Sequence, residues 1–136
     1  MTRATLRVVA AALFDERGRV LIAQRPAGKH LAGRWEFPGG KIADGETEQA
    51  ALARELGEEL GVVPLQSEPL MSLVHDYPDR RVDLHLHVVS RFVGEARGLD
   101  GQALRWVSLA ALPQQDLLEA DAPFVEALQR RGPPAR

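Results

Sequence analysis

The sequence predicts a single-domain α/β protein in which a mixed β-sheet is covered by helices on both faces. Two observations lead to this class. Strand-like runs flank one central segment with helical periodicity, and a second helical segment lies near the end of the chain. A length of 136 residues is typical of one domain, and no repeat or long linker divides the sequence. We therefore assign residues 1–136 to one domain, with a frayed tail at 132–136.

The first third of the chain alternates extended runs with turns. Leu6–Phe14 is rich in Val, Ala and Leu, and Arg19–Gln24 follows it after a turn, so we expect these two strands to pair as a hairpin. The next segment, Pro26–Gly33, is predicted to be a loop. Trp35–Phe37 is predicted to be a short extended piece that Pro38-Gly39-Gly40 stops.

A helix is predicted over Thr47–Leu60. Thr47 is a good N-cap residue and Gly61 is a good C-terminal stop. At about 100° per residue, one arc of the helix carries Leu52, Leu56 and Leu60, with Ala53 at its edge. We expect this apolar stripe to face the sheet.

The second half of the chain contains three further strands and a helix. Gln66–Tyr77 and Arg81–Val93 are predicted to be strands joined by the turn at 78–80, and Ala103–Val107 is predicted to be a last short strand. Pro123–Arg130 is predicted to be a helix. Along the second long strand, one face carries Val82, Leu84, Leu86 and Val88, and the other, which we expect to be a polar face, carries Asp83, His85 and His87.

The central helix also carries a ridge of carboxylates beside its apolar stripe. Glu48, Glu55, Glu58 and Glu59 fall in one arc of the helical wheel. Like charges three and four residues apart destabilise a helix, and anions near its C-terminus oppose the helix dipole. A divalent cation would remove these costs, and oxygen ligands favour Mg²⁺ or Mn²⁺. On spacing alone, a solvated acidic face explains the ridge equally well.

Composition excludes several classes of protein. The net charge of −2 lacks the strong basic excess that binding to a long nucleic acid requires. The sequence contains no cysteine, so it has no disulfide framework and no thiolate metal site. The apolar run that begins at Val8 is too short for a membrane span and lacks a signal-peptide cleavage site. We therefore expect a cytoplasmic protein that binds no membrane.

The acidic helix belongs to a longer pattern of fixed spacing. Gly40, Glu46, Arg54-Glu55-Leu56, Glu58-Glu59 and Gly61-Val62 match the Nudix box at every specified position. The stretch Trp35–Ile42 resembles the one that precedes this box in MutT-like members, and the similarity extends over roughly residues 8–128. The chain thus resembles the MutT-like branch of the Nudix hydrolase superfamily. The implied fold is the Nudix α/β/α sandwich around a mixed sheet.

The resemblance implies a reaction and a set of site residues. MutT-like members hydrolyse nucleoside triphosphates to the monophosphate and pyrophosphate with the help of Mg²⁺. By position, the metal ligands would be the Gly40 carbonyl oxygen and the carboxylates of Glu55, Glu58, Glu59 and Asp100. Arg54 would orient Glu55, which is our choice of general base, with Asp100 and Glu58 as rivals. Glu46 would support the loop that leads into the helix.

Residues outside the Nudix box would bind the base of the nucleotide. By resemblance, the candidate substrate-binding residues are Arg25, His30, Phe37, Arg80 and Asp121, with Lys41 as a phosphate contact. The best-known MutT pattern has asparagine at the position of Asp121. An ionised aspartate only accepts hydrogen bonds. It could accept from the N7–H of 8-oxoguanine or from the exocyclic amine of cytosine.

Three functions therefore stay open. The first is a MutT-like 8-oxo-dGTP diphosphatase that cleanses the nucleotide pool. The second is a pyrophosphohydrolase of CTP or modified dCTP, because Leu84–His87 and Ala120–Pro123 resemble that branch as well. The third is a Nudix module that binds a nucleotide without cleaving it, although the intact box argues against it. We expect a monomer or a weak homodimer whose partner is the nucleotide substrate.

Overall fold

The computed structural model describes residues 4–135, which form two β-sheets and two α-helices. The larger sheet has four strands in the order β4-β1-β6-β5, and the smaller has three in the order β3-β2-β7. The elements are β1 (Ala4–Leu13), β2 (Val20–Gln24), β3 (Trp35–Glu36), β4 (Gly39–Lys41), α1 (Glu48–Leu60), β5 (Val63–Asp76), β6 (Arg80–Val93), β7 (Leu104–Val107) and α2 (Ala122–Arg131). Two short 3₁₀ turns, Leu112–Gln114 and Glu119–Asp121, precede α2.

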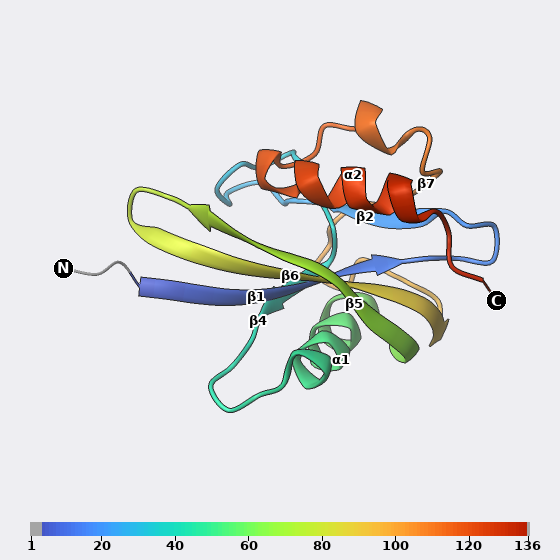
Figure 1. Cartoon of the computed structure of the whole chain (residues 1–136), viewed down its shortest axis with the longest axis horizontal. Coiled ribbons are helices and arrows are strands. Elements are labelled where there is room, and N and C mark those ends of the chain that lie inside the picture. The colour runs from blue at the N-terminus through green and yellow to red at the C-terminus, as the bar shows by residue number, and fades with distance from the viewer. Residues whose placement is uncertain (1–3, 136) are drawn as a thin grey trace.

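The larger sheet is mixed, and a helix lies on each of its faces (Figure 1). Strand β1 runs parallel to β6 and antiparallel to β4, while β5 and β6 form a long antiparallel hairpin. Alternate residues of β1 enter two separate cores. Val9 and Ala11 pack with α1, and Ala10 and Ala12 pack with the side of the sheet that α2 covers. These findings confirm the predicted α/β class, the mixed sheet and its two covered faces.

Helix α1 begins and ends where the sequence predicts. The Thr47 hydroxyl accepts a hydrogen bond from the Ala50 amide, and Gly61 ends the helix in the left-handed conformation with a φ of 71°. Leu52, Leu56 and Leu60 are fully buried, as expected. Ala53, at the edge of the predicted stripe, is exposed, and Ala51 is the alanine that is buried with the leucines.

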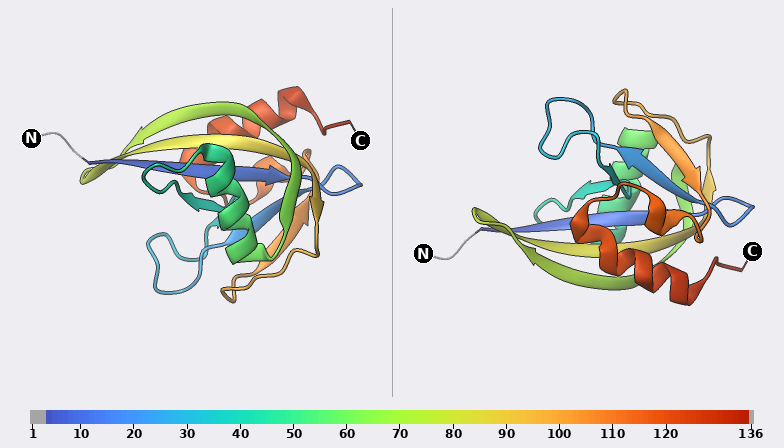
Figure 2. Two further views of the ribbon diagram at one scale, coloured as in Figure 1. Left: turned by 90° about the horizontal axis from the view of Figure 1, so that it is seen from below. Right: turned by 90° about the horizontal axis from the view of Figure 1, so that it is seen from above.

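The predicted pairing of the first two strands is wrong. β1 pairs with β4 and β6, whereas β2 belongs to the smaller sheet with β3 and β7, and only an isolated bridge joins Phe14 to Val20. Both edges of β1 are occupied, so the chain must leave the larger sheet after the turn (Figure 2). Pro38-Gly39-Gly40 also does not stop the extended chain, because Gly39–Lys41 forms β4.

The remaining strands and helix lie close to their predicted positions. β5 begins three residues earlier than predicted, and α2 is one residue longer at each end. Asp83, His85 and His87 share one face of β6, but this face is not open to solvent: it lies against the first turn of α1, and His87 is only 2% exposed. No helix within residues 4–135 is long and apolar enough to cross a membrane.

Candidate active site

A pocket of about 400 Å³ collects side chains from both halves of the chain beside β1. The residues predicted for metal and phosphate that line it are Gly40, Lys41, Glu55, Glu59 and Asp100. The residues predicted to contact the base all line it as well, namely Arg25, His30, Phe37, Arg80 and Asp121. Of the predicted site residues, Glu46, Arg54 and Glu58 lie outside the lining. Segments far apart in the sequence thus meet in one cavity.

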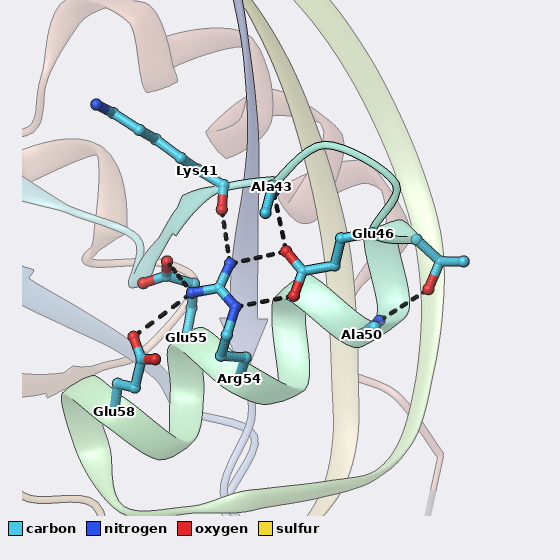
Figure 3. Close-up of polar contacts among 8 residues, drawn as sticks. Lys41, Ala43, Glu46, Ala50, Arg54, Glu55 and Glu58 are labelled. Atoms are coloured by element: carbon cyan, nitrogen blue, oxygen red, sulfur yellow. Dashed lines mark hydrogen bonds and ion pairs between the residues drawn. The ribbon is translucent and has the colours of Figure 1, made fainter.

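Arg54 links the loop before α1 to the carboxylates on the helix (Figure 3). Its guanidinium forms two hydrogen bonds of 2.8 Å with Glu46 and one of 2.8 Å with Glu55. It also donates to the Lys41 carbonyl oxygen and lies 3.5 Å from Glu58. These hydrogen bonds lower the pKa of Glu46 to about 2, so this carboxylate stays ionised. The ion pair expected between Arg54 and Glu55 is therefore present.

Two glycines let the backbone of β4 approach neighbouring groups closely. A Cβ atom on Gly40 would lie 2.4 Å from the Glu55 carboxyl carbon, and one on Gly39 would lie 2.0 Å from the Val9 carbonyl oxygen. Neither position can hold a side chain without displacing its neighbour. Glycine at 40 therefore lets the Glu55 carboxylate lie directly on the β4 backbone.

Glu59 is a half-buried acid surrounded by other acids. Burial, together with the charges of Glu55, Glu36 and Asp100, raises its pKa to about 8. The Gly39 amide opposes the shift by donating a 3.1 Å hydrogen bond to the Glu59 carboxylate. Nearby negative charge without a balancing cation is the condition that a bound divalent metal relieves.

The oxygen donors here suit a hard cation such as Mg²⁺. The carboxylates are not already gathered around one point: no group of three or more His, Cys, Asp or Glu side chains within residues 4–135 has that arrangement. Glu55 is turned toward Arg54, and the Glu58 side chain is 61% exposed. The donor chemistry and the charge around Glu59 fit a divalent metal, and the side chains would have to turn to bind it.

The second wall of the pocket contains a buried acid. Asp121 is 7% exposed, and the Phe37 amide donates a hydrogen bond to it. Burial, followed by the charge of Glu36, raises the pKa of Asp121 to about 7. At neutral pH this carboxyl is therefore neutral in part of the molecules, and a carboxylic acid can donate as well as accept. The assumption that Asp121 only accepts was too narrow.

Glu36 is a pocket residue that sequence reasoning missed. It lies in β3, lines the pocket and forms a 3.0 Å ion pair with Arg25. Burial raises its own pKa, and its charge raises the pKa values of both Glu59 and Asp121. Glu36 therefore lies near both Glu59 and Asp121. Strand alternation could not have identified it, because adjacent residues of a strand face opposite sides and Phe37 was already assigned to the pocket.

Other predicted base contacts have structural partners as well. Arg25 donates through Nε to the His30 carbonyl oxygen at 2.8 Å, so it ties down the loop that carries His30. Phe37 is 4% exposed and its ring centroid lies 6.4 Å from that of Phe124, so it belongs to the core as well as the lining. Arg80 is exposed and lies 5.9 Å from the Tyr77 ring centroid.

A second missed residue connects the end of α1 to the loop at Asp100. The Gln102 side chain accepts from the Asp100 amide at 2.9 Å and donates to the Glu59 carbonyl oxygen at 3.2 Å. Gln102 therefore fixes the approach of Asp100, an exposed residue, to the helix that carries Glu59. A glutamine in a loop gives no sign of this role in the sequence alone.

Comparisons with known proteins agree with this geometry. The NUDIX domain family matches residues 9–127. An Escherichia coli protein named 8-oxo-dGTP diphosphatase is 37% identical over 92% of this chain and 97% of its own length. An Escherichia coli CTP pyrophosphohydrolase is 40% identical over 88% of each chain. A solved MutT structure from Burkholderia pseudomallei superposes with a TM-score of 0.83 at 28% identity, covering 93% of this chain and 99% of that one. The chain therefore belongs to the Nudix hydrolases, in their MutT-like branch.

Proposed function

We propose that this protein hydrolyses 8-oxo-dGTP to the nucleoside monophosphate and pyrophosphate, and so cleanses the nucleotide pool of oxidised guanine. One observation carries the proposal: a single pocket joins the carboxylates of the Nudix helix to the buried carboxyl of Asp121. A nucleotide that spans the pocket would bring its phosphates to Glu55 and Glu59 and its base to Asp121.

The carboxylates would act together with Mg²⁺, for which Mn²⁺ could substitute. The ligands would come from Gly40, Glu55, Glu58, Glu59 and Asp100. When bound, Mg²⁺ offsets the charge of the phosphate chain and makes water a better nucleophile. Glu55, held by Arg54 at 2.8 Å, would accept the proton of the attacking water. The exposed Lys41 would contact a phosphate.

Recognition of 8-oxoguanine would depend on the protonation of Asp121. As a neutral acid, Asp121 can donate one hydrogen bond to a base carbonyl and accept another from an N–H group. 8-Oxoguanine offers this pair at O6 and N7–H, whereas guanine has an acceptor at N7. The raised pKa of Asp121, about 7, therefore supports selection of the oxidised base. Arg25, His30, Phe37 and Arg80 would complete the base pocket.

Hydrolysis of CTP or a modified dCTP is the second candidate, and a specific observation favours it. Glu36 and Asp121 give the pocket two acids, and the charge of Glu36 raises the pKa of Asp121. Two carboxyl groups suit the exocyclic amine of cytosine, which offers two N–H donors. The relative named CTP pyrophosphohydrolase supports this alternative as well.

A nucleotide panel separates the candidates. The protein is incubated with Mg²⁺ and 8-oxo-dGTP, dGTP, CTP, dCTP or 5-methyl-dCTP, and pyrophosphate release is measured as kcat/KM. We expect the highest kcat/KM for 8-oxo-dGTP. Preference for a cytosine nucleotide would support the second candidate. Binding of a nucleotide without release of pyrophosphate would support a non-catalytic module.

The expected setting follows from the substrate. A nucleotide-pool enzyme would work in the cytoplasm as a monomer or weak homodimer, without long nucleic acid or membrane as a partner. Light scattering at micromolar and higher concentrations would test the oligomeric state.

A further inference from the structure

On the face of β6 opposite the pocket's apolar lining, two histidines converge on one carboxylate. His87 Nε2 lies 2.8 Å from Oε1 of Glu48, and His85 Nδ1 lies 3.4 Å from the same oxygen. The other ring nitrogen of His85 lies 3.1 Å from the Asp83 carboxylate. This set, which we name the Glu48 clamp, joins the first residue of α1 to the middle of β6.

The clamp is a directional contact at the start of α1, before the first apolar side chain of the helix that packs on the sheet. The apolar contacts of the helix come from Ala51, Leu52, Leu56 and Leu60, all beyond its first three residues. Gln49 and Ala50 in the first turn are exposed. Apolar packing is non-directional, whereas a hydrogen bond fixes both distance and orientation. The clamp therefore contributes a fixed distance and orientation between the first turn of α1 and the sheet.

The position of Glu48 relates the clamp to the candidate catalytic carboxylates. Glu55 follows Glu48 by seven residues. The two residues therefore lie about 10 Å apart along the helix axis, and their side chains leave the helix in directions that differ by about 20°. A rotation of α1 by about 10° would move a glutamate carboxylate by about 1 Å, given its distance from the axis. Displacements of about 1 Å can lower turnover about a hundredfold.

Stability alone does not account for His87. The side chain is buried, and its Nδ1 atom has no hydrogen-bond partner among the residues that the structure describes. An unpaired buried polar atom opposes folding, and an apolar side chain of similar size avoids that cost. The gain that this histidine offers is its hydrogen bond to Glu48.

We propose that His87, assisted by His85, is a positioning residue that acts through Glu48 to set the place of Glu55 and Glu59 over β4. The inference rests on the proposed function, since it takes Glu55 and Glu59 as the carboxylates that serve hydrolysis.

Three variants test the clamp. His87→Leu removes the hydrogen bond but fills the same space with an apolar side chain. His87→Gln retains an N–H donor near the position of Nε2. Gln49→Ala is the matched control, because Gln49 lies in the same turn and is exposed. In the absence of Mg²⁺ and nucleotide, thermal unfolding and amide hydrogen exchange in the first two turns of α1 are measured. With Mg²⁺ and the preferred nucleotide, kcat and KM are measured.

We expect His87→Leu to keep or raise the thermal midpoint, to speed exchange in the first turns, and to lower kcat about tenfold or more with little change in KM. His87→Gln should restore kcat to within about threefold of wild type, and Gln49→Ala should change none of these quantities. A folded His87→Leu protein with wild-type kcat overturns the inference, and so does a His87→Gln protein as impaired as His87→Leu. If His87→Leu does not fold, Glu48→Ala, which removes the acceptor of the hydrogen bond, takes its place with the same expected fall in kcat.

The two proposals fail in different ways. A wild-type protein that releases no pyrophosphate from any nucleotide contradicts the proposed function. An active wild-type protein with an unaffected His87→Leu variant contradicts the clamp alone.

Discussion

Glu55 is held from two sides, and this is the residue-scale basis of the proposed chemistry. Arg54 donates to its carboxylate at 2.8 Å, and the absence of a side chain at Gly40 leaves room for that carboxylate on β4. These contacts restrict the Glu55 side chain, so it loses less conformational freedom when it turns to its reacting position. In the proposed chemistry, a carboxylate oxygen of Glu55 accepts the proton of the attacking water.

Replacing the carboxylates tests their roles. Glu55→Gln and Glu58→Gln should each lower kcat by about a hundredfold or more, because the amide neither accepts a proton nor binds a hard cation well. Circular dichroism and thermal unfolding should show an intact fold. Near-normal turnover in both variants would refute the assignment.

Gly40 offers a second test at the residue scale. Gly40→Ala should lower kcat about a hundredfold, because its Cβ atom would lie 2.4 Å from the Glu55 carboxyl carbon and displace it. Gly57→Ala is the matched control, since nothing lies within 4 Å of a Cβ atom at that helical position. The control should retain kcat and gain about 1 kcal/mol of stability from helix propensity. Equal kcat in both variants would contradict the close approach.

Asp121 predicts a pH dependence of stability. Its pKa rises from 3.8 to about 7 on folding, so between these values the folded protein binds more protons than the unfolded chain. This contribution to stability is complete below pH 3.8 and is lost as the pH rises toward about 7. Asp121→Asn should abolish it, so the free energy of unfolding of the wild type should fall relative to the variant by at most about 1.4 kcal/mol per pH unit. Parallel curves from urea denaturation at pH 4 to 8 would contradict the shift.

At the scale of elements, the helix was predictable and the strand pairing was not. Thr47, Gly61 and the leucine spacing act within α1, so local rules gave its bounds. The partner of β2 depends on which strands already occupy the edges of β1, and no local pattern carries that information. His87 was misjudged for the same reason: its alternation was visible, but the helix that covers it was not.

Arg54 joins α1 to the loop that precedes it, and a substitution at Arg54 tests whether this connection matters for turnover. Arg54→Lys should lower kcat about tenfold, because an ammonium group cannot hold both oxygens of Glu46 and still reach Glu55 and the Lys41 carbonyl oxygen. The KM for the nucleotide should change little. Steady-state kinetics with a nucleotide titration measures both, and an unchanged kcat would show that the guanidinium is dispensable.

At the scale of the whole molecule, the pocket is a product of the tertiary fold. The fixed spacing of the Nudix box predicted the helix carboxylates as site residues, and Glu55 and Glu59 line the pocket, whereas their roles in metal binding stay a prediction. Glu36 and Gln102 were not identified, because their roles depend on contacts between elements that are distant in the sequence. Asp121 was identified, but its raised pKa required knowledge of how deeply the fold buries it.

The central claim is that one bound nucleotide has its phosphate chain at the carboxylates of α1, where the chain is cleaved, and its base at Asp121. Product analysis by ion-exchange chromatography tests it most directly, using 8-oxo-dGTP with Mg²⁺ and either the wild type or Glu55→Gln. We predict that the wild type yields the monophosphate and pyrophosphate in equal amounts, only when Mg²⁺ is present, and that Glu55→Gln yields about a hundredfold less of both. Release of the diphosphate and inorganic phosphate, or equal yields from the two proteins, would contradict the account.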